Sequence, residues 1–364
     1  MVKSGNRKSK KWVVAAAVAA AVIVAAVVTF LGLYRAGVFT SSQSASDYYY
    51  SADNMGLYTA VGDGFAAVSG SELQVFDKAG NLTVNKNFLM TQPRVASGGE
   101  LALAYDAGGT AAEIFSDSGI VKSITASGNI ISGKVNENGY VTLCVQETGY
   151  KGVVYVYNTK GEEIFEWLSG SAYVMTAAVS PDNKYLSVLS YTDAGTRVTK
   201  LRLSNEDYRE DYEIPQVVGI DTDFAGSDIL VLTGDVLYHI DGGGNITEMY
   251  NFNGKYLNAY VLGETATLVL RQHQAGGVSE IVSVEENGAV NGTQTAEGSV
   301  VALDANDRYT AVLTDSELRI YDTALREQIA YYEVTGGLEV ILREKGDAIV
   351  AMRHSAHVYP ADTK

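Results

Sequence analysis

A strand-and-turn unit recurs along most of this chain and constrains its fold more than any other feature. In each copy an apolar strand ends in an aromatic or aliphatic residue and a polar tight turn follows, as in Leu73–Phe76 before Asp77–Gly80. The unit returns roughly every 40 residues from residue 48 onward. Its eight copies end at Phe76, Phe115, Tyr157, Leu203, Ile240, Val284, Tyr321 and Tyr359.

A second series of turns recurs with the same period as the first. Each member precedes a very apolar strand, and the clearest is Pro181–Lys184 within Ser180–Leu186. Two turn series at one period indicate about four strands per repeat. A four-stranded antiparallel unit of about 40 residues cannot bury both faces alone, but radially stacked units cover one another. We therefore expect an all-β fold, a β-propeller of eight four-stranded blades. Seven blades are the alternative, if the first or last unit is irregular.

The ends of the repeat predict how the ring closes. The last copy ends at its third strand, shortly after Tyr359, and so lacks an outer strand. The segment Ser46–Ser51 precedes the first full copy and is rich in tyrosine, a good strand former. We expect this segment to supply the missing strand, which would join the chain ends and cover an open sheet edge.

The N-terminal part has a different character from the repeats. Residues 12–34 are 23 uncharged, mostly apolar residues, enough for about 35 Å of helix and a bilayer span. Five bases precede this stretch and one follows it, which predicts a cytoplasmic N-terminus. We expect a basic cytoplasmic tail (1–11), a single-pass transmembrane helix (12–34), a linker (35–47) and an extracytoplasmic propeller (48–364). A cleaved signal peptide is the alternative.

Charge and cysteine content narrow the classes of function. The formal net charge is −16, and the first 35 residues hold six bases and no acid, which leaves −22 on the rest. A body this acidic repels nucleic acid, so we expect no nucleic-acid partner. The single cysteine, Cys144, lies in an alternating apolar strand, and we expect a buried side chain and not a nucleophile.

The Ser180–Leu186 stretch resembles the strand-turn signature of WD40-like, TolB-like and quinoprotein-like propellers. The whole layout is similar to uncharacterised single-span, propeller-bearing membrane proteins of Gram-positive bacteria. This resemblance covers residues 48–364 as a repeat pattern. It implies an architecture and a location at the cell membrane, and it supplies no catalytic residues.

In a propeller, the loops that join second and third strands (here called joins) lie on the same face as the loops that join one blade to the next. In an acidic body, bases collected on one face indicate a surface for a ligand or partner. Several of these joins carry bases, aromatic residues or histidines that could form such a surface. The alternative is that they are ordinary solvated hairpin tips without a binding role. The predicted ligand or partner residues are Tyr150, Lys151, Asp193, Arg271, His273, Arg353 and His354.

The sequence gives weak support to metal or catalytic chemistry. His354 and His357 are three apart on a predicted hairpin and would face opposite sides of a strand, without a cysteine cluster to complete a zinc site. The aspartates at 221, 223, 228, 304 and 307 alternate as in calcium loops but lack a full loop pattern. No nucleophile elbow, phosphate loop or zinc-protease motif is present. We expect no metal, no cofactor and no identifiable catalytic residue.

Two functions of different class remain. The first is a non-catalytic binding or scaffold module, anchored in the bilayer by residues 12–34, for a protein, peptide or glycan partner. The alternative is an extracytoplasmic propeller hydrolase or lyase, which would need carboxylates converging at the central channel. The sequence favours the binding module because no catalytic constellation is visible.

Overall fold

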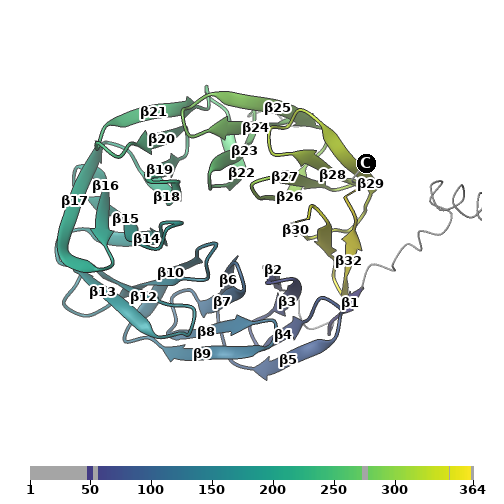
Figure 1. The fold of residues 1–364 in the computed structure, drawn as a ribbon, viewed down its shortest axis with the longest axis horizontal. Coiled ribbons are helices and arrows are strands. Elements are labelled where there is room, and N and C mark those ends of the chain that lie inside the picture. Colours follow the sequence, from purple (N-terminus) through teal and green to yellow (C-terminus); the bar gives the residue numbers. More distant parts are fainter. Residues whose placement is uncertain (1–46, 52–55, 273–277, 344, 362–364) are drawn as a thin grey trace, which may run out of the picture. The chain divides into compact units, whose positions relative to one another are not determined.

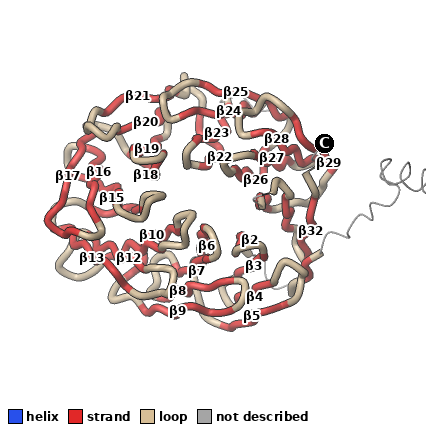
Figure 2. Tube along the Cα trace, viewed as in Figure 1, coloured by secondary structure: helices blue, strands red, loops and turns tan. Residues whose placement is uncertain are grey.

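The computed structural model describes residues 47–51, 56–272, 278–343 and 345–361. Within them the chain forms eight four-stranded antiparallel sheets arranged as a ring around a central channel (Figure 1). Strands and loops make up all of the described residues, without a helix (Figure 2). The prediction of an eight-bladed propeller is confirmed, and the seven-bladed alternative is wrong.

Each blade runs from an inner strand at the channel to an outer strand at the rim (Figure 1). The first four blades comprise β2 (Leu57–Val61), β3 (Gly64–Val68), β4 (Glu72–Phe76) and β5 (Leu82–Asn87); β6 (Pro93–Gly98), β7 (Leu101–Asp106), β8 (Ala111–Ser116) and β9 (Gly119–Thr125); β10 (Asn129–Val135), β11 (Val141–Gln146), β12 (Gly152–Tyr157) and β13 (Glu163–Ser169); and β14 (Tyr173–Val179), β15 (Tyr185–Thr192), β16 (Gly195–Arg202) and β17 (Asn205–Pro215).

Blades 5 to 8 repeat the pattern. They comprise β18 (Gly219–Ala225), β19 (Asp228–Thr233), β20 (Val236–Ile240) and β21 (Ile246–Asn251); β22 (Tyr256–Val261), β23 (Thr265–Arg271), β24 (Ser279–Glu285) and β25 (Val290–Ala296); β26 (Val300–Ala305), β27 (Tyr309–Thr314), β28 (Glu317–Asp322) and β29 (Gln328–Glu333); and β30 (Glu339–Leu342), β31 (Ala348–Ala351), β32 (Ser355–Tyr359) and β1 (Tyr48–Tyr49).

Strand direction sorts the loops onto two faces. Every inner strand begins at the same face, which we call the entry face. It carries the joins between blades and the joins between second and third strands. Every inner strand ends at the opposite face, which we call the turn face. It carries the turns between first and second strands and between third and fourth strands. The repeating turns of the sequence therefore lie on the turn face, where Asn183 adopts a positive φ of 58°.

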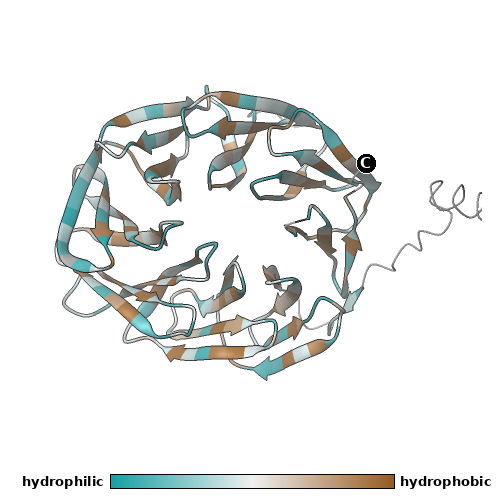
Figure 3. Ribbon diagram, in the orientation of Figure 1, coloured by the Kyte–Doolittle hydropathy of each residue, from teal (hydrophilic) through white to brown (hydrophobic). Residues whose placement is uncertain are grey.

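The core consists of eight apolar clusters, and each fills the space between two neighbouring blades. The second and third strands are therefore largely buried on both faces, whereas inner strands such as β6 and β22 are only partly buried and the outer strands mix apolar and polar residues (Figure 3). Cys144 belongs to the cluster between blades 3 and 4 and is fully buried, as expected. Burial raises the pKa of its thiol to about 12, so the thiol is protonated and unreactive at neutral pH.

The ring closes through the N-terminal strand. β1 pairs antiparallel with β32, with Tyr48 opposite Ala356 and Tyr49 opposite Ser355. The prediction that this segment completes the last blade is confirmed. The paired strand is shorter than the segment proposed from sequence.

Aromatic side chains reinforce this closure. Tyr48 belongs by backbone to blade 8, yet its ring stacks on Phe65 of blade 1 with centroids 5.1 Å apart. Tyr50 and Tyr58 extend the same stack. The hydroxyl of Tyr50 lies 2.5 Å from the carbonyl oxygen of Met352, and Asp47 pairs with His357 at 2.7 Å. Backbone pairing therefore holds the N-terminal strand in blade 8, and side-chain packing joins that strand to blade 1.

The predicted transmembrane helix, 12–34, lies outside the described residues, as do the predicted tail and all of the linker before Asp47. Within the described part of the chain, the search for a helix long and apolar enough to cross a membrane finds none. Membrane anchoring therefore stays a prediction from the sequence.

Replacing Tyr48 by Ala tests the closure. Tyr48 is fully buried, so the variant should lose about 3–5 kcal/mol of unfolding free energy, as large buried aromatic residues generally do. The neighbouring Tyr49 is 70% exposed on the same strand, and Tyr49→Ala should cost under about 0.5 kcal/mol. Urea unfolding of both variants measures the difference, and equal losses would contradict the role of Tyr48.

Candidate functional site

The central channel opens at the turn face into a cavity of about 460 Å³. All eight blades contribute to its wall, mainly through the ends of their inner strands and the turns that follow. This volume is in the range that ligand sites occupy in proteins, about 300–1,000 Å³. The mouth of the channel at the turn face is therefore the first candidate site.

Carboxylates dominate the charge of this mouth. No lysine or arginine is among the residues that line the cavity. The lining acids are Glu137, Asp223, Glu264, Asp304 and Asp307. They come from blades 3, 5, 6 and 7, so the acids surround the opening and do not cluster in one loop.

A lysine links blades 3 and 5 just inside this mouth. Lys134 of β10 reaches past blade 4 to β18, where its Nζ lies 2.8 Å from Asp221 and 3.1 Å from Asp223. Tyr260 donates a hydrogen bond of 3.3 Å to Asp221. Burial lowers the pKa of Lys134, but the two aspartates outweigh it and hold the pKa above its usual value. The network links blades 3, 5 and 6.

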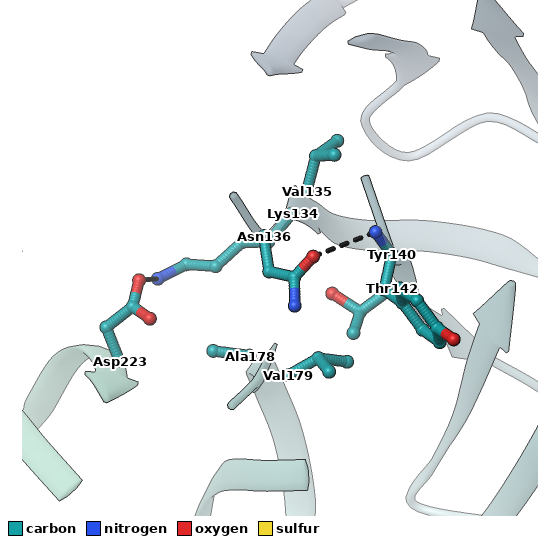
Figure 4. Close-up of a pocket in the computed structure, with 8 residues that line it drawn as sticks. All are labelled: Lys134, Val135, Asn136, Tyr140, Thr142, Ala178, Val179 and Asp223. Atoms are coloured by element: carbon teal, nitrogen blue, oxygen red, sulfur yellow. Dashed lines mark hydrogen bonds and ion pairs between the residues drawn. The ribbon is translucent and has the colours of Figure 1, made fainter. Parts of the chain in front are cut away.

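Figure 4 shows Lys134 directed at Asp223, with Asn136 beside it. The side-chain oxygen of Asn136 accepts a hydrogen bond from the Tyr140 amide at 2.8 Å. The small cavity between these residues measures about 10 Å³, enough for about one water molecule. This smaller space cannot hold an organic ligand.

Asp304 is held in place by the backbone. Its carboxylate accepts hydrogen bonds from the amide of Leu342, at 2.7 Å, and from that of Ala305, at 2.9 Å. The first bond joins blade 7 to blade 8. Burial raises the pKa of Asp304 to about 6, and the two amides lower it only in part.

The other acids at the mouth have few partners. Glu264 accepts a hydrogen bond from the Gly226 amide at 3.1 Å. Glu137 and Asp307 form no hydrogen bond or ion pair with any residue that the structure describes. The pKa of Glu137 is raised by burial first, and then by the charges of Asp307 and Glu264. These three carboxylates therefore share one negative field.

Neighbouring turns are tied together around this rim. The Gly62 amide donates to Gly99 between blades 1 and 2, at 3.2 Å. Asn136 donates to Ser180 between blades 3 and 4, at 3.1 Å, and Asn306 donates to Arg343 between blades 7 and 8, at 3.2 Å. A rim held by its own hydrogen bonds loses little freedom when it binds a ligand.

The predicted partner residues lie on the other face. Those that the structure describes lie in joins between second and third strands, except Arg271, which ends second strand β23, so all share the entry face. His273 lies outside the described residues. Tyr150 and Lys151 are in blade 3, Asp193 in blade 4, Arg271 in blade 6, and Arg353 and His354 in blade 8. They share a face but not a pocket.

Of these residues, Lys151 has the most informative contact. Its Nζ lies 2.6 Å from the hydroxyl of Tyr173 and 4.2 Å from the centre of that ring. Tyr173 begins the inner strand of blade 4 and is 52% exposed. Arg353 and His354 are exposed, without a hydrogen bond or ion pair from their side chains to described residues.

Exposed apolar side chains gather on the entry face. Large apolar residues there stand at the starts of inner strands and in the joins. They are Leu89, Tyr150, Tyr173, Val218, Ile220, Val278, Val301 and Leu338. The other large exposed apolar residues among those described lie on outer strands, and none lies in a turn of the turn face. The two faces therefore differ in chemistry.

The metal hypotheses receive no structural support. Asp221 and Asp223 bind Lys134, which occupies the position that a cation would need. His357 contacts Asp47 and Ser355, whereas His354 is exposed on the adjoining join. Within the described ranges, no group of three or more His, Cys, Asp or Glu side chains is placed to hold a metal ion.

Sequence reasoning singled out Asp223, Asp304 and Asp307, but it missed Glu137 and Glu264 at the channel mouth and the apolar residues of the entry face. The turns at Asn138, Gly263 and Asn306 were expected, but nothing in the sequence marks which turn residues face the channel. Val217 and Val218 offered a signal, because two valines after Pro215 are unusual in a polar join.

Solved propellers share this fold at low sequence identity. The designed protein Ika8 matches with a TM-score of 0.62 and 10% identity, over 87% of this chain and 99% of that one. BamB from Moraxella catarrhalis matches with a TM-score of 0.55 and 10% identity, over 87% and 98%. The C-terminal WD40 domain of Sif2 matches with a TM-score of 0.59 and 12% identity, over 87% and 98%. These similarities show the fold alone.

Residues 35–355 match the model of a protein family described as a family of unknown function, DUF5711. No curated protein matches the chain in sequence. The match covers the whole ring except the end of the last blade, so it concerns the propeller and not one loop of it.

The raised pKa of Asp304 predicts a pH dependence of stability. An unfolded chain ionises this carboxyl near pH 3.8, and the folded protein ionises it near pH 6. Ionisation therefore destabilises the fold as the pH rises through this window, with the full cost above about pH 6. Relative to the Asp304→Asn variant, the unmodified protein should lose up to about 3 kcal/mol of unfolding free energy between about pH 4 and pH 7.

Urea unfolding of both proteins across this range measures that loss. Burial raises the pKa of Glu339 to about 7 and the charge of Asp304 also helps to raise it, so both proteins are compared in a Glu339→Gln background, which removes this second titration. Stability curves that run parallel from about pH 4 to pH 7 would contradict the prediction.

Proposed function

The chain belongs to the DUF5711 family of unknown function, and from its surfaces we propose that it is a membrane-anchored, extracytoplasmic scaffold that binds a protein partner without catalysis. The apolar stretch 12–34 and the bases before it support the anchor and its orientation. The proposed partner surface is the entry face. The observation that carries this proposal is the gathering of exposed apolar side chains there.

The part of the entry face over blades 3 to 5 is the best supported contact region. Tyr150, Tyr173, Val218 and Ile220 lie there, with exposures from 43% to 68%. Exposed apolar groups that gather on one face mark interaction sites more often than scattered ones do. Lys151 adds a cation beside Tyr173, and aromatic residues with a nearby cation suit protein recognition. We propose a partner segment with apolar side chains and a carboxylate.

The topology supports an orientation for this scaffold. β1 runs antiparallel to β32, so the chain enters β1 from the turn face. The predicted linker therefore joins the propeller at the turn-face end of blade 8. A partner can reach the entry face without meeting this attachment point.

Replacing Ile220 tests the contact region. With the full-length chain in detergent, selection from a displayed library of random peptides should enrich apolar, acidic sequences. Ile220→Asp should weaken the binding of an enriched peptide at least about tenfold, because a charge replaces an apolar contact. Fluorescence polarisation measures the affinity.

The matched control is Ile246→Asp. Ile246 is an exposed isoleucine near the end of outer strand β21, so the same substitution should change the affinity less than about twofold. Equal effects of the two substitutions would contradict the proposed surface. Enrichment of no peptide, alongside binding of cell-wall glycans, would replace a protein partner by a glycan.

One observation favours the second candidate, a hydrolase or lyase. Carboxylates converge at the turn-face mouth, as this function requires, and Asp304 has a raised pKa. Asp223 is paired with Lys134 and Asp304 with backbone amides, so Glu137, Glu264 and Asp307 are the acids left for chemistry.

This candidate predicts hydrolysis or cleavage of a substrate that depends on the carboxylates at the turn-face mouth. Incubated with cell-wall glycan and peptide fragments, the full-length chain would release products, and Glu137→Gln or Asp307→Asn would lower the rate at least about 100-fold. Mass spectrometry of the fragments measures the release. Glu286→Gln, which removes an exposed acid of the same face away from the cavity, is the control. Absence of turnover, or equal rates in all variants, would exclude the enzyme.

A further inference from the structure

Three side chains in the outer half of blade 8 form a continuous chain of hydrogen bonds. The Ser355 hydroxyl lies 2.9 Å from Nε2 of His357, and Nδ1 of the same ring lies 2.7 Å from the Asp47 carboxylate. Ser355 and His357 are two residues apart on β32, so they face the same side of the sheet. Asp47 directly precedes β1, so the closure of the ring places it beside a histidine 310 residues away in the chain.

The order of these contacts determines where the proton of the imidazole lies. A carboxylate only accepts hydrogen bonds, so Nδ1 of His357 carries the proton that Asp47 accepts. In the neutral ring Nε2 is then the acceptor, and the Ser355 hydroxyl donates to it. A serine bonded to a basic nitrogen, with the ring oriented by a carboxylate, is the arrangement that activates a serine as a nucleophile.

The three groups are open to small molecules in solution. The side chains of His357 and Asp47 are 32% and 38% exposed, and Ser355 is partly exposed. Tyr49, which is 70% exposed, stands directly opposite Ser355 in the strand pair. Side chains at opposite positions of an antiparallel pair lie next to one another, so this ring offers an apolar surface beside the hydroxyl.

Other pairs in the described part of the chain contain only part of this arrangement. Nε2 of His239 lies 2.9 Å from Asp228, but no described hydroxyl bonds to the second nitrogen of that ring. The Ser51 hydroxyl lies 3.2 Å from Glu72, without an imidazole. These two pairs therefore serve as controls within the same molecule.

We propose that Ser355 is an acyl-acceptor site, which takes one acyl group from an activated carboxylic ester. Ser355 Oγ forms a bond to the acyl carbon while Nε2 of His357 takes the hydroxyl proton. The bond from the acyl carbon to the leaving oxygen then breaks, and His357 passes the proton to that oxygen, which departs as an alcohol or phenol. Asp47 is a positioning residue that holds the ring in the required tautomer.

This step adds one acyl group to each chain and is a covalent modification, not turnover. It therefore goes beyond the scaffold function proposed above and does not depend on it. The site also lies apart from the carboxylates of the channel mouth, so its test does not report on them.

Reaction of the full-length chain in detergent with 4-nitrophenyl acetate tests the proposal. Mass spectrometry of the tryptic peptide 354–364, in which Ser355 is the only serine, measures the rate of acetylation. Ser355 should react at least about 100-fold faster than Ser51, because a positioned general base contributes a factor of this size. His357→Gln should remove this advantage, and Ser355→Ala should remove the acetyl group.

The matched control for the base is His239→Gln, which removes a histidine–aspartate pair from blade 5 and should change the rate less than about twofold. Asp47→Asn should slow the reaction at least about tenfold, because an amide does not enforce the tautomer. Asp47→Glu keeps a carboxylate and should retain most of the rate, a difference that a merely structural role of Asp47 would not produce.

Three results would overturn the proposal. One is acetylation of Ser355 no faster than that of Ser51, a comparison that uses the unmodified chain and needs no variant to fold. Another is an unchanged rate in folded His357→Gln protein. The third is equal slowing by His239→Gln and His357→Gln, which would indicate a general effect of losing such a pair.

Discussion

The burial of both faces of every blade is the constraint on which the rest of the structure depends. Each of the eight apolar clusters lies between two blades, so no blade completes its core alone. A row of such sheets would leave two apolar faces in water, and a closed ring leaves none. Closure at Tyr48 is therefore part of the core, because the ring of Tyr48 packs on Phe65 while its backbone completes blade 8.

The same antiparallel order gives the propeller two chemically different faces. The turns between first and second strands lie on one face, and this places Glu137, Glu264 and Asp307 at one mouth of the channel. Apolar residues such as Val218 and Ile220 are exposed on the other face. The protein surface proposed above follows from this division.

Sequence periodicity predicted the strands and their faces well, because burial of each strand leaves a local pattern. The predicted partner residues that the structure describes share the entry face, since the order of strands alone determines that placement. Their separation around the ring was not predictable in the same way. The hydrogen bond from Lys151 to Tyr173 joins two blades, and no sequence pattern around either residue predicts it.

By itself the sequence determined the number of blades, the closing strand and the burial of Cys144, since each depends on a repeat or an alternation that local residues encode. Tertiary structure alone decided that Lys134 of blade 3 reaches Asp221 and Asp223 of blade 5, and that three carboxylates from separate blades lie at one mouth whose described lining holds no base. These groups are about 40 to 170 residues apart in the chain. Their interactions depend on distance through space, which the curvature of the closed ring sets and which no local pattern records.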